Sequence, residues 1–381
     1  WTLYQREANG WKLMRADATD RTREPSPLAG FLDGRLLLSV NPTLVTNREA
    51  SSGPARPEIL QFVASDLEHT PEVIRPQWRG QPAFTEHSYR SFAADGPGRE
   101  FILLQNIGYT HAEWTFCNQA GQWFSGQLHW PDGREYPKPQ PIRVCYPNVL
   151  LQNRAVYFCG VSDITEPYPE WRAFKKELTG QQWDYDFRRL FFTWCPDITT
   201  GKFRDWIEVA SRDSTCGWIM PGDLWVGPDG TAHIVWTERA LDERLRAKFF
   251  PEAKQSHSIG YATVYGGKLT GRRTLLIAEE GGSKEIPSAP RFQATLDHRL
   301  FLIYYVQGTD ANGRRVSENR LLEILPDGKT GPSVKVNFHK PFTSYFTATV
   351  RAGSPLLNTL ELLGQRAGSP QTISYARVRL K

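Results

Sequence analysis

The chain has 381 residues, of which 40% are hydrophobic and 23% charged, and it carries a formal net charge of +5. This composition excludes a disordered chain, and the scattered Lys and Arg residues argue against a nucleic-acid partner. No stretch approaches the roughly 18 consecutive apolar residues of a membrane span, so no membrane span is expected.

Aromatic residues make up 12% of the chain, with 13 Trp against only 2 Met, and 31 Gly and 27 Pro punctuate it. This balance favours strands and turns over helices. We therefore expect an all-β fold with little helix.

A hairpin pattern recurs along the chain. In each copy a short strand leads to a turn with Gly, Asp or Asn, and a second strand of aliphatic and aromatic residues follows. The turns begin at Asp33, Gly98, Asn153, Asp229, Asp297 and, more weakly, Gly353. Successive copies lie roughly 55 to 70 residues apart, which leaves room for the two further strands of a propeller blade.

The repeat predicts a β-propeller formed by residues 1–381 as a single catalytic domain. Six or seven four-stranded blades fit, and seven is the preferred number; a long β-sandwich is the alternative fold. Segments at 1–4, 11–14 and 373–380 also resemble strands. Pairing them in one blade would close the ring and remove exposed sheet edges.

The chain has five cysteines, at positions 117, 145, 159, 195 and 216, and no Cys-x-x-Cys pair. An odd number without metal-type spacing indicates buried thiols, with a disulfide or a metal ligand as the alternative. No cofactor is expected to be required for catalysis, and a structural metal ion is left open.

Functional side chains of propellers gather where the first strand of each blade begins. His87, Tyr89 and Arg90 lie at such a start, and alternation along a strand puts His87 and Tyr89 on one face. Histidine suits proton transfer at neutral pH, although a structural histidine is an equal alternative here. Tyr146 has the corresponding place in the next blade, where it would face His87 or simply line the channel.

These segments resemble a family, the seven-bladed propeller polysaccharide lyases with BNR-type repeats, such as ulvan lyases. The segment His87–Gly96 is similar to the family's Gly-His-Asn-Tyr-Pro-Ser strand, and Tyr146–Val149 to its Tyr-Pro-Arg-Phe strand. A third match is Ser256–Ala262, similar to Asn-His-Asp-Ile-Tyr-Tyr-Ala. The resemblance spans Thr85 to Gly267.

The resemblance implies that His87 and Tyr146 are catalytic, abstracting the C5 proton of a uronic acid and protonating the leaving oxygen. It also implies polar groups that neutralise the uronate carboxylate. The family's second His falls near Ile107 and its Arg near Gly160 here, so other residues would substitute. The candidate substrate-binding residues are Arg90, His111, Arg172, His257 and Arg291.

The expected function is thus a polysaccharide lyase that cleaves a uronic-acid-containing polysaccharide by β-elimination. The alternatives are a glycoside hydrolase on the same scaffold, for example a rhamnosidase acting next to glucuronate, and a non-catalytic glycan-binding propeller. The expected partner is an anionic polysaccharide or oligosaccharide, bound by a monomer. The chain shows no signal peptide, so a secreted or periplasmic location is inferred from the function.

Overall fold

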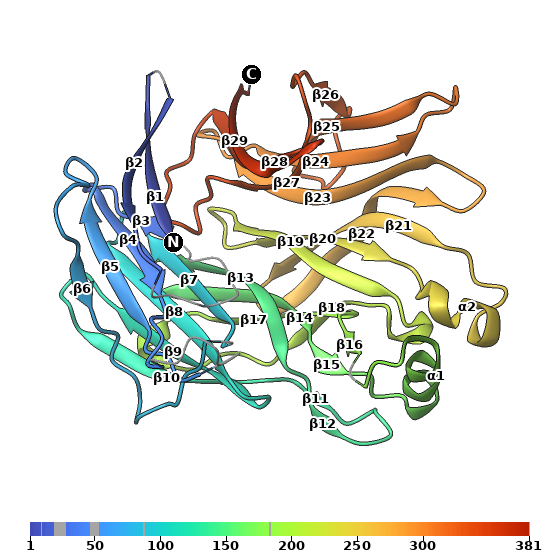
Figure 1. Ribbon diagram of the computed structural model, residues 1–381, viewed down its shortest axis with the longest axis horizontal. Coiled ribbons are helices and arrows are strands. Elements are labelled where there is room, and N and C mark those ends of the chain that lie inside the picture. Colours follow the sequence, from blue (N-terminus) through green and yellow to red (C-terminus); the bar gives the residue numbers. More distant parts are fainter. Residues whose placement is uncertain (9, 19–27, 46–52, 87, 183, 381) are drawn as a thin grey trace.

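The computed structural model describes residues 1–8, 10–18, 28–45, 53–86, 88–182 and 184–380. The predicted hairpins form, and each of the first five becomes the inner two strands of an antiparallel four-stranded sheet. Figure 1 shows the sheets following one another round the molecule in chain order, from blue to red. The predicted all-β propeller is confirmed.

The first three blades run from the inner to the outer strand in chain order. Blade 1 consists of β3 (Leu28–Gly30), β4 (Arg35–Val40), β5 (Glu58–Val63) and β6 (Glu72–Ile74). Blade 2 consists of β7 (Arg90–Asp95), β8 (Glu100–Ile107), β9 (His111–Cys117) and β10 (Trp123–His129). Blade 3 consists of β13 (Val144–Gln152), β14 (Ala155–Ser162), β17 (Arg189–Cys195) and β18 (Ile207–Ser211).

The other three blades complete the ring. Blade 4 consists of β19 (Trp218–Val226), β20 (Ala232–Arg239), β21 (Ser256–Tyr265) and β22 (Lys268–Glu279). Blade 5 consists of β23 (Lys284–Ala294), β24 (Leu300–Thr309), β25 (Arg315–Ile324) and β26 (Val334–Val336). Blade 6 has three strands in the described chain, namely β27 (Phe342–Thr347), β28 (Thr359–Arg366) and β29 (Ser369–Arg379).

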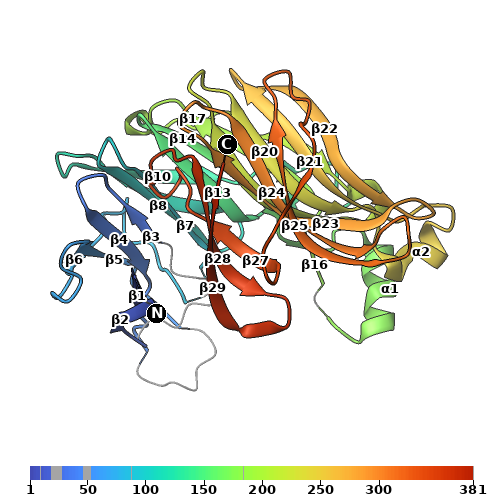
Figure 2. The same cartoon turned by 90° about the horizontal axis from the view of Figure 1, so that it is seen from above.

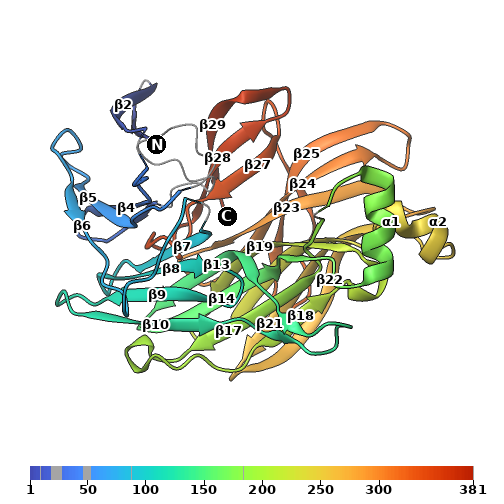
Figure 3. The same cartoon turned by 60° about the horizontal axis from the view of Figure 1, so that its bottom comes forward.

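The ring therefore has six blades, and the preference for seven is wrong. The extra length lies in insertions between strands. Between β14 and β17 the chain forms β15 (Ile164–Thr165), helix α1 (Pro169–Thr179) and β16 (Tyr185–Asp186), and helix α2 (Glu243–Phe249) joins β20 to β21. The two helices lie side by side (Figure 3) and pack through aromatic rings, for example Trp171 on Phe250 at 5.5 Å. A short hairpin of β11 (Asp132–Gly133) and β12 (Gln140–Pro141) precedes blade 3.

Apolar side chains fill the space between consecutive blades. The strands alternate, so each sheet gives one set of residues to the preceding blade and the other set to the next. On β8, for example, Phe101 and Leu103 face blade 1, whereas Ile102 and Leu104 join the core with blade 3. The α-helices of the described residues are α1 and α2, and neither is long or apolar enough to cross a membrane.

The N-terminal hairpin and the C-terminal strand contact each other without forming a shared sheet. Strands β1 (Thr2–Glu7) and β2 (Gly10–Ala16) pair only with each other in the described residues, so the predicted blade of N- and C-terminal strands is wrong. Figure 2 shows this hairpin beside blade 6. One side of it packs on the core of blade 1 through Trp1, Leu3 and Met14.

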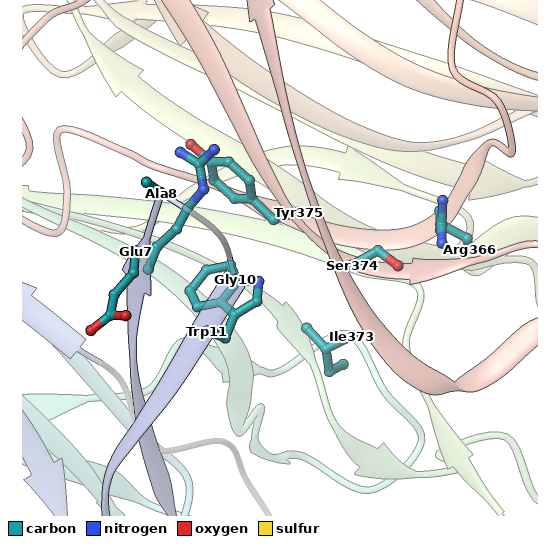
Figure 4. Close-up of a pocket in the computed structure, with 9 residues that line it drawn as sticks. Glu7, Ala8, Gly10, Trp11, Arg366, Ile373, Ser374 and Tyr375 are labelled. Carbon is teal, nitrogen blue, oxygen red and sulfur yellow. The ribbon is translucent and has the colours of Figure 1, made fainter.

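The other side of the hairpin faces β29. The ring of Trp11 contacts Tyr375 at 5.8 Å between centroids, and the Arg6 guanidinium lies 4.5 Å from the Tyr375 ring. A cavity of about 400 Å³ opens between these strands (Figure 4). The hairpin therefore lies between the first and last blades. Among the described residues it contacts β29 through side chains and not through the hydrogen bonds of a sheet.

The connection from β27 to β28, residues 348–358, fills the centre of the ring and is called the central segment below. Its backbone bonds the ends of two inner strands: Gly30 N donates to Ala352 O at 2.8 Å and Ala94 N to Arg351 O at 3.0 Å. Gly353 has φ 81°, and a Cβ there would lie 2.0 Å from Gly30 O, so only glycine fits. The central segment thus blocks the ring at the end where the inner strands finish.

Arg351 connects this segment to blade 4. Its guanidinium lies 2.8 Å from the carboxylate of Asp223, which is buried and also accepts a hydrogen bond from Phe292 N of blade 5 at 3.0 Å.

An Arg351→Ala variant is expected to lose about 2 kcal/mol of unfolding free energy, because it leaves a buried carboxylate without its cation. Thermal or denaturant unfolding measures the loss. Arg134→Ala, which removes an exposed surface pair, is the control and should leave the melting temperature unchanged. Equal melting temperatures for all three proteins would contradict the expectation.

Candidate functional site at the mouth of the ring

The opposite end of the ring, where the inner strands begin, is called the mouth. Four tyrosines and one arginine meet there and are called the tyrosine cluster. They come from blades 2 and 3 and from their connections, because consecutive inner strands bring their starts together. The members are Tyr89 before β7, Tyr109 in the β8–β9 turn, Arg143 before β13, Tyr146 in β13 and Tyr185 in β16.

Arg143 is the centre of this cluster. Its guanidinium carbon lies 4.3 Å from the centroid of the Tyr109 ring, 5.6 Å from that of Tyr89 and 5.7 Å from that of Tyr185. Its Nη2 donates to Asp163 Oδ2 at 2.7 Å and its Nε to the Asp163 carbonyl at 3.2 Å. The arginine is therefore fixed in place by one carboxylate and faced by three rings.

The tyrosine hydroxyl groups form two pairs. The Tyr89 and Tyr146 oxygens lie 3.2 Å apart, as do those of Tyr109 and Tyr185. Burial, followed by the hydrogen bond with Tyr146, raises the pKa of Tyr89. The hydrogen bond with Tyr109, followed by burial, raises the pKa of Tyr185. Both phenols are protonated at neutral pH, so the mouth presents hydrogen-bond donors and acceptors on aromatic rings.

Tyr146 has an unusual backbone. Its φ of 49° lies in the left-handed region, although it stands in a strand and precedes Pro147, where extended backbone is preferred. The ladder between β13 and β14 is irregular here, with a register shift between Cys145 and Asn148. The bulge turns the ring toward Tyr89 and toward Phe187, 5.6 Å away. Such strained residues concentrate at functional sites.

Behind the cluster lies a buried group of charges, called the ion network. Lys175 of α1 lies 2.7 Å from Glu166 and 3.2 Å from Asp186, and all three side chains are buried. Arg188 lies 3.1 Å from Glu166 and also donates to Asp213 at 2.6 Å. The network fixes the chain on both sides of Tyr185 and Phe187.

The pKa values of Asp186 and Glu166 shift in opposite directions. Burial raises the pKa of Asp186 well above its usual value, and the neighbouring Glu166 adds to this shift. Burial also raises the pKa of Glu166, but Asp186, Arg188 and Lys175 outweigh it and lower that pKa to about 2. The two cations, Lys175 and Arg188, thus lie among the carboxyl groups of Glu166, Asp186 and Asp213.

Glu166, Asp186 and Cys216 lie close enough to act as metal ligands, with candidate ligand atoms within 4.8 Å of one another. The cations of the network already take that space: Lys175 Nζ lies 2.7 Å from Glu166, and Arg188 Nη1 lies 3.1 Å from Cys216 Sγ. The set therefore does not fit a metal ion. All five cysteines are buried and free, as the sequence indicated.

The structure places the predicted catalytic residues only in part. Tyr146 lies at the mouth as expected, whereas His87 lies outside the described residues. Arg90 begins β7, is buried, and pairs across the strands with Gln105. Arg172 lies exposed on α1.

The three other predicted binding residues have partners of their own. His111 bonds to Thr110 at 2.8 Å and Glu113 at 3.1 Å. His257 pairs with Arg239 in blade 4, and burial, followed by that arginine, lowers its pKa. Arg291 donates to the carbonyl of Gly222, and burial lowers its pKa. Among the described residues, no hydrogen bond or ring contact joins these three side chains to Tyr146.

Sequence reasoning missed Arg143, Asp163, Tyr109 and Tyr185. Of these four residues, only Arg143 could have been predicted from the sequence, because it stands three residues before Tyr146. The other three come from connections between strands, and their meeting depends on the path of those loops.

A larger cavity of about 590 Å³ lies between blades 4 and 5 at the end where the inner strands finish, and we call it the far cavity. Burial lowers the pKa of His233 in its wall from the ordinary value of 6.5 to about 4, against the opposing charge of Asp229. The unfolded chain then binds more protons than the folded one between these values. Stability from this group is present above pH 6.5 and is lost as the pH falls toward 4.

The slope of the unfolding free energy from His233 is at most about 1.4 kcal/mol per pH unit. A His233→Phe variant should therefore show a flatter dependence on pH than the wild type in this window. Urea unfolding at several pH values measures both slopes, and their difference isolates the histidine from the carboxyl groups that titrate nearby. Parallel curves would show that His233 titrates normally.

No family model matches the chain, and no curated protein matches it. Solved structures are similar in fold at low identity. A protein of unknown function from Dyadobacter fermentans has 12% identity and a TM-score of 0.48, with 94% of this chain and 96% of that chain covered. The α-L-arabinofuranosidase Arb93A from Fusarium graminearum has 12% identity and a TM-score of 0.48, with 95% and 96% covered. An α-L-arabinanase from Penicillium chrysogenum, solved with arabinobiose, has 10% identity and a TM-score of 0.45, with 92% of each covered.

The expected polysaccharide lyase is corrected by these comparisons. The named enzymes among these structures are glycoside hydrolases, and no BNR-repeat family model matches the chain. The short motifs behind the expectation lie at strand starts, where any propeller places polar and aromatic residues. At identities of 10–12% and TM-scores of 0.45–0.48, these structures assign no activity to this chain.

Proposed function

We propose that the protein is a glycoside hydrolase that binds its glycan at the mouth, on the tyrosine cluster. The observation that carries the proposal is the strained Tyr146, whose hydroxyl is held 3.2 Å from that of Tyr89 beside the Arg143–Asp163 pair. Aromatic rings pack against sugar faces, and their hydroxyl groups bond sugar hydroxyls.

Tyr146 is the proposed proton donor. Its hydroxyl protonates the leaving glycosidic oxygen as the bond to the anomeric carbon breaks. The hydroxyl of Tyr89 and the positive charge of Arg143, which faces the Tyr89 ring, stabilise the phenolate that forms. Water adds to the anomeric carbon and passes its proton to a carboxylate, a role that Asp163 fills in this cluster. His87 remains a predicted catalytic residue in this scheme.

A specific observation favours a second candidate, a non-catalytic glycan-binding propeller. Asp163 is 2% exposed and bound to Arg143, whereas a glycosidase usually presents two carboxyl groups to the sugar. The same rings and hydroxyl groups would then bind a glycan without cleaving it.

The test is a panel of neutral and uronate-containing polysaccharides, including rhamnose linked to glucuronate. Hydrolysis yields new reducing ends without the ultraviolet absorbance of a C4–C5 double bond. Binding by calorimetry with no new reducing ends would select the second candidate. Neither binding nor cleavage across the panel would contradict both. A secreted or periplasmic location belongs to this proposal, since polymeric glycans occur outside the cytoplasm. A monomeric state belongs to it as well.

A further inference from the structure

The far cavity combines the size and lining of a ligand site. Its volume of about 590 Å³ lies within the range of small-molecule sites, about 300–1,000 Å³. The walls come from blades 4 and 5, at the turns that follow β19, β23 and β25 and on the neighbouring parts of β20, β21 and β22. Neighbouring inner strands run in the same direction, so these turns lie at the end of the ring away from the tyrosine cluster.

Three aromatic side chains line one wall. The rings of Trp225 and His233 are 4.9 Å apart, and Nδ1 of His233 lies 2.6 Å from the hydroxyl of Tyr261. Burial raises the pKa of Tyr261 to about 12, and it lowers that of His233 to about 4. Both groups are neutral at pH 7, so the hydrogen bond has two forms. Either Tyr261 donates to Nδ1 and Nε2 carries the proton, or the Nδ1 proton is donated to the Tyr261 oxygen and Nε2 is an acceptor.

This arrangement leaves hydrogen-bonding capacity unused. Within the described chain, Nε2 of His233 has no hydrogen-bond partner, and the Tyr261 hydroxyl bonds only to Nδ1. A ligand hydroxyl in the cavity can therefore bond to both groups, accepting from one and donating to the other. The pair offers one donor and one acceptor beside an aromatic face.

The rim carries charges of both signs, and most are already engaged. Asp229 accepts from Thr231, Asp297 accepts from Thr295, and Glu323 pairs with Arg299 at 2.8 Å. Arg273 has no ion pair among the described residues, and it lies at the edge beside Gly328. The lining contains four carboxyl residues, with Asp327 the fourth, against the two arginines Arg273 and Arg299, so its net negative charge opposes an anionic ligand.

We propose that the far cavity is a second carbohydrate-binding site, which takes a neutral saccharide unit. An uncharged ligand with hydroxyl groups around an apolar face matches the neutral histidine–tyrosine pair, the Trp225 ring and the acidic rim together. The ligand class rests on the proposed function, because a glycan at the mouth makes a second glycan site on the same chain useful. The site itself rests on the cavity alone.

The test measures binding by calorimetry with three probes: arabinobiose as a neutral saccharide, glucuronate as an anion and choline as a cation. Arabinobiose should bind, and Tyr261→Phe and His233→Ala should each weaken that binding by roughly 10-fold, the scale of a lost hydrogen bond. Tyr265→Phe, an exposed tyrosine at the end of the same strand, is the matched control and should bind as the wild type does.

A Tyr146→Phe variant separates the two sites. It should retain the arabinobiose binding that His233→Ala weakens, whatever its effect on turnover, so failure at the mouth and failure at the far cavity are distinguishable. Circular dichroism confirms that each variant is folded, and Tyr261→Phe, which removes one oxygen, stands in if His233→Ala unfolds. Preference for choline or glucuronate, no binding of arabinobiose, or binding unchanged by Tyr261→Phe would each overturn the proposal.

Discussion

A Tyr146→Phe variant is expected to lower turnover of the glycan substrate by about 10²-fold or more, with the melting temperature almost unchanged. The change removes only the hydroxyl that is paired with Tyr89 at 3.2 Å, and general acid catalysis contributes on the order of 10²–10⁴-fold. The ring contacts with Tyr89 and Phe187 remain, so KM should change much less than kcat.

Initial rates of reducing-end release over a range of substrate concentrations measure both constants. Tyr185→Phe is the matched control, because it removes a paired hydroxyl from the same cluster at its exposed edge. This control should affect KM more than kcat. If Tyr146→Phe retains the parental kcat, Tyr146 is not the proton donor.

Replacement of Lys175 by Met is expected to cost about 3–5 kcal/mol of unfolding free energy, the largest stability effect that we expect from one substitution. The side chain is 1% exposed and lies 2.7 Å from Glu166 and 3.2 Å from Asp186. Methionine matches its length but leaves the negative charge of Glu166 with Arg188 as its only close cation within the ion network.

Denaturant unfolding measures the loss, and Lys176→Met on the next, exposed position of α1 is the control. The double variant Lys175→Met with Glu166→Gln tests the cause. It should recover part of the stability, because it neutralises the carboxylate that has lost one of its two cations. A single variant as stable as the control would show that Lys175 contributes no net stabilisation.

The sequence predicted those blades whose inner hairpin is determined by residues close together in the chain. Turns at Asp33, Gly98, Asn153, Asp229 and Asp297 lie between the inner two strands of blades 1 to 5, because strand alternation and turn residues act over a few positions. The sixth copy of the hairpin pattern, at Gly353, predicted the presence of a blade but not the length of the connection between its strands. There the turn is enlarged into the central segment, and contacts with distant strands determine its path.

The same distinction applies to the site. Tyr146 could be placed at the mouth since its position within its blade is local information. Arg143 stands nearby in sequence, but Tyr185 reaches it from beyond α1, an insertion whose position the ion network fixes. Such convergence depends on buried contacts between residues far apart in sequence. Blade number failed for a related reason, since insertions lengthen blades without adding strands to the ring.

The central segment also bears on how molecules move in and out. Where it meets β19 and β23, the cavity beside it holds only about 20 Å³, which is too small for a sugar. We therefore expect a sugar that enters by the mouth to leave by the mouth as well. Product and substrate then compete for the mouth, and added product should inhibit the reaction competitively.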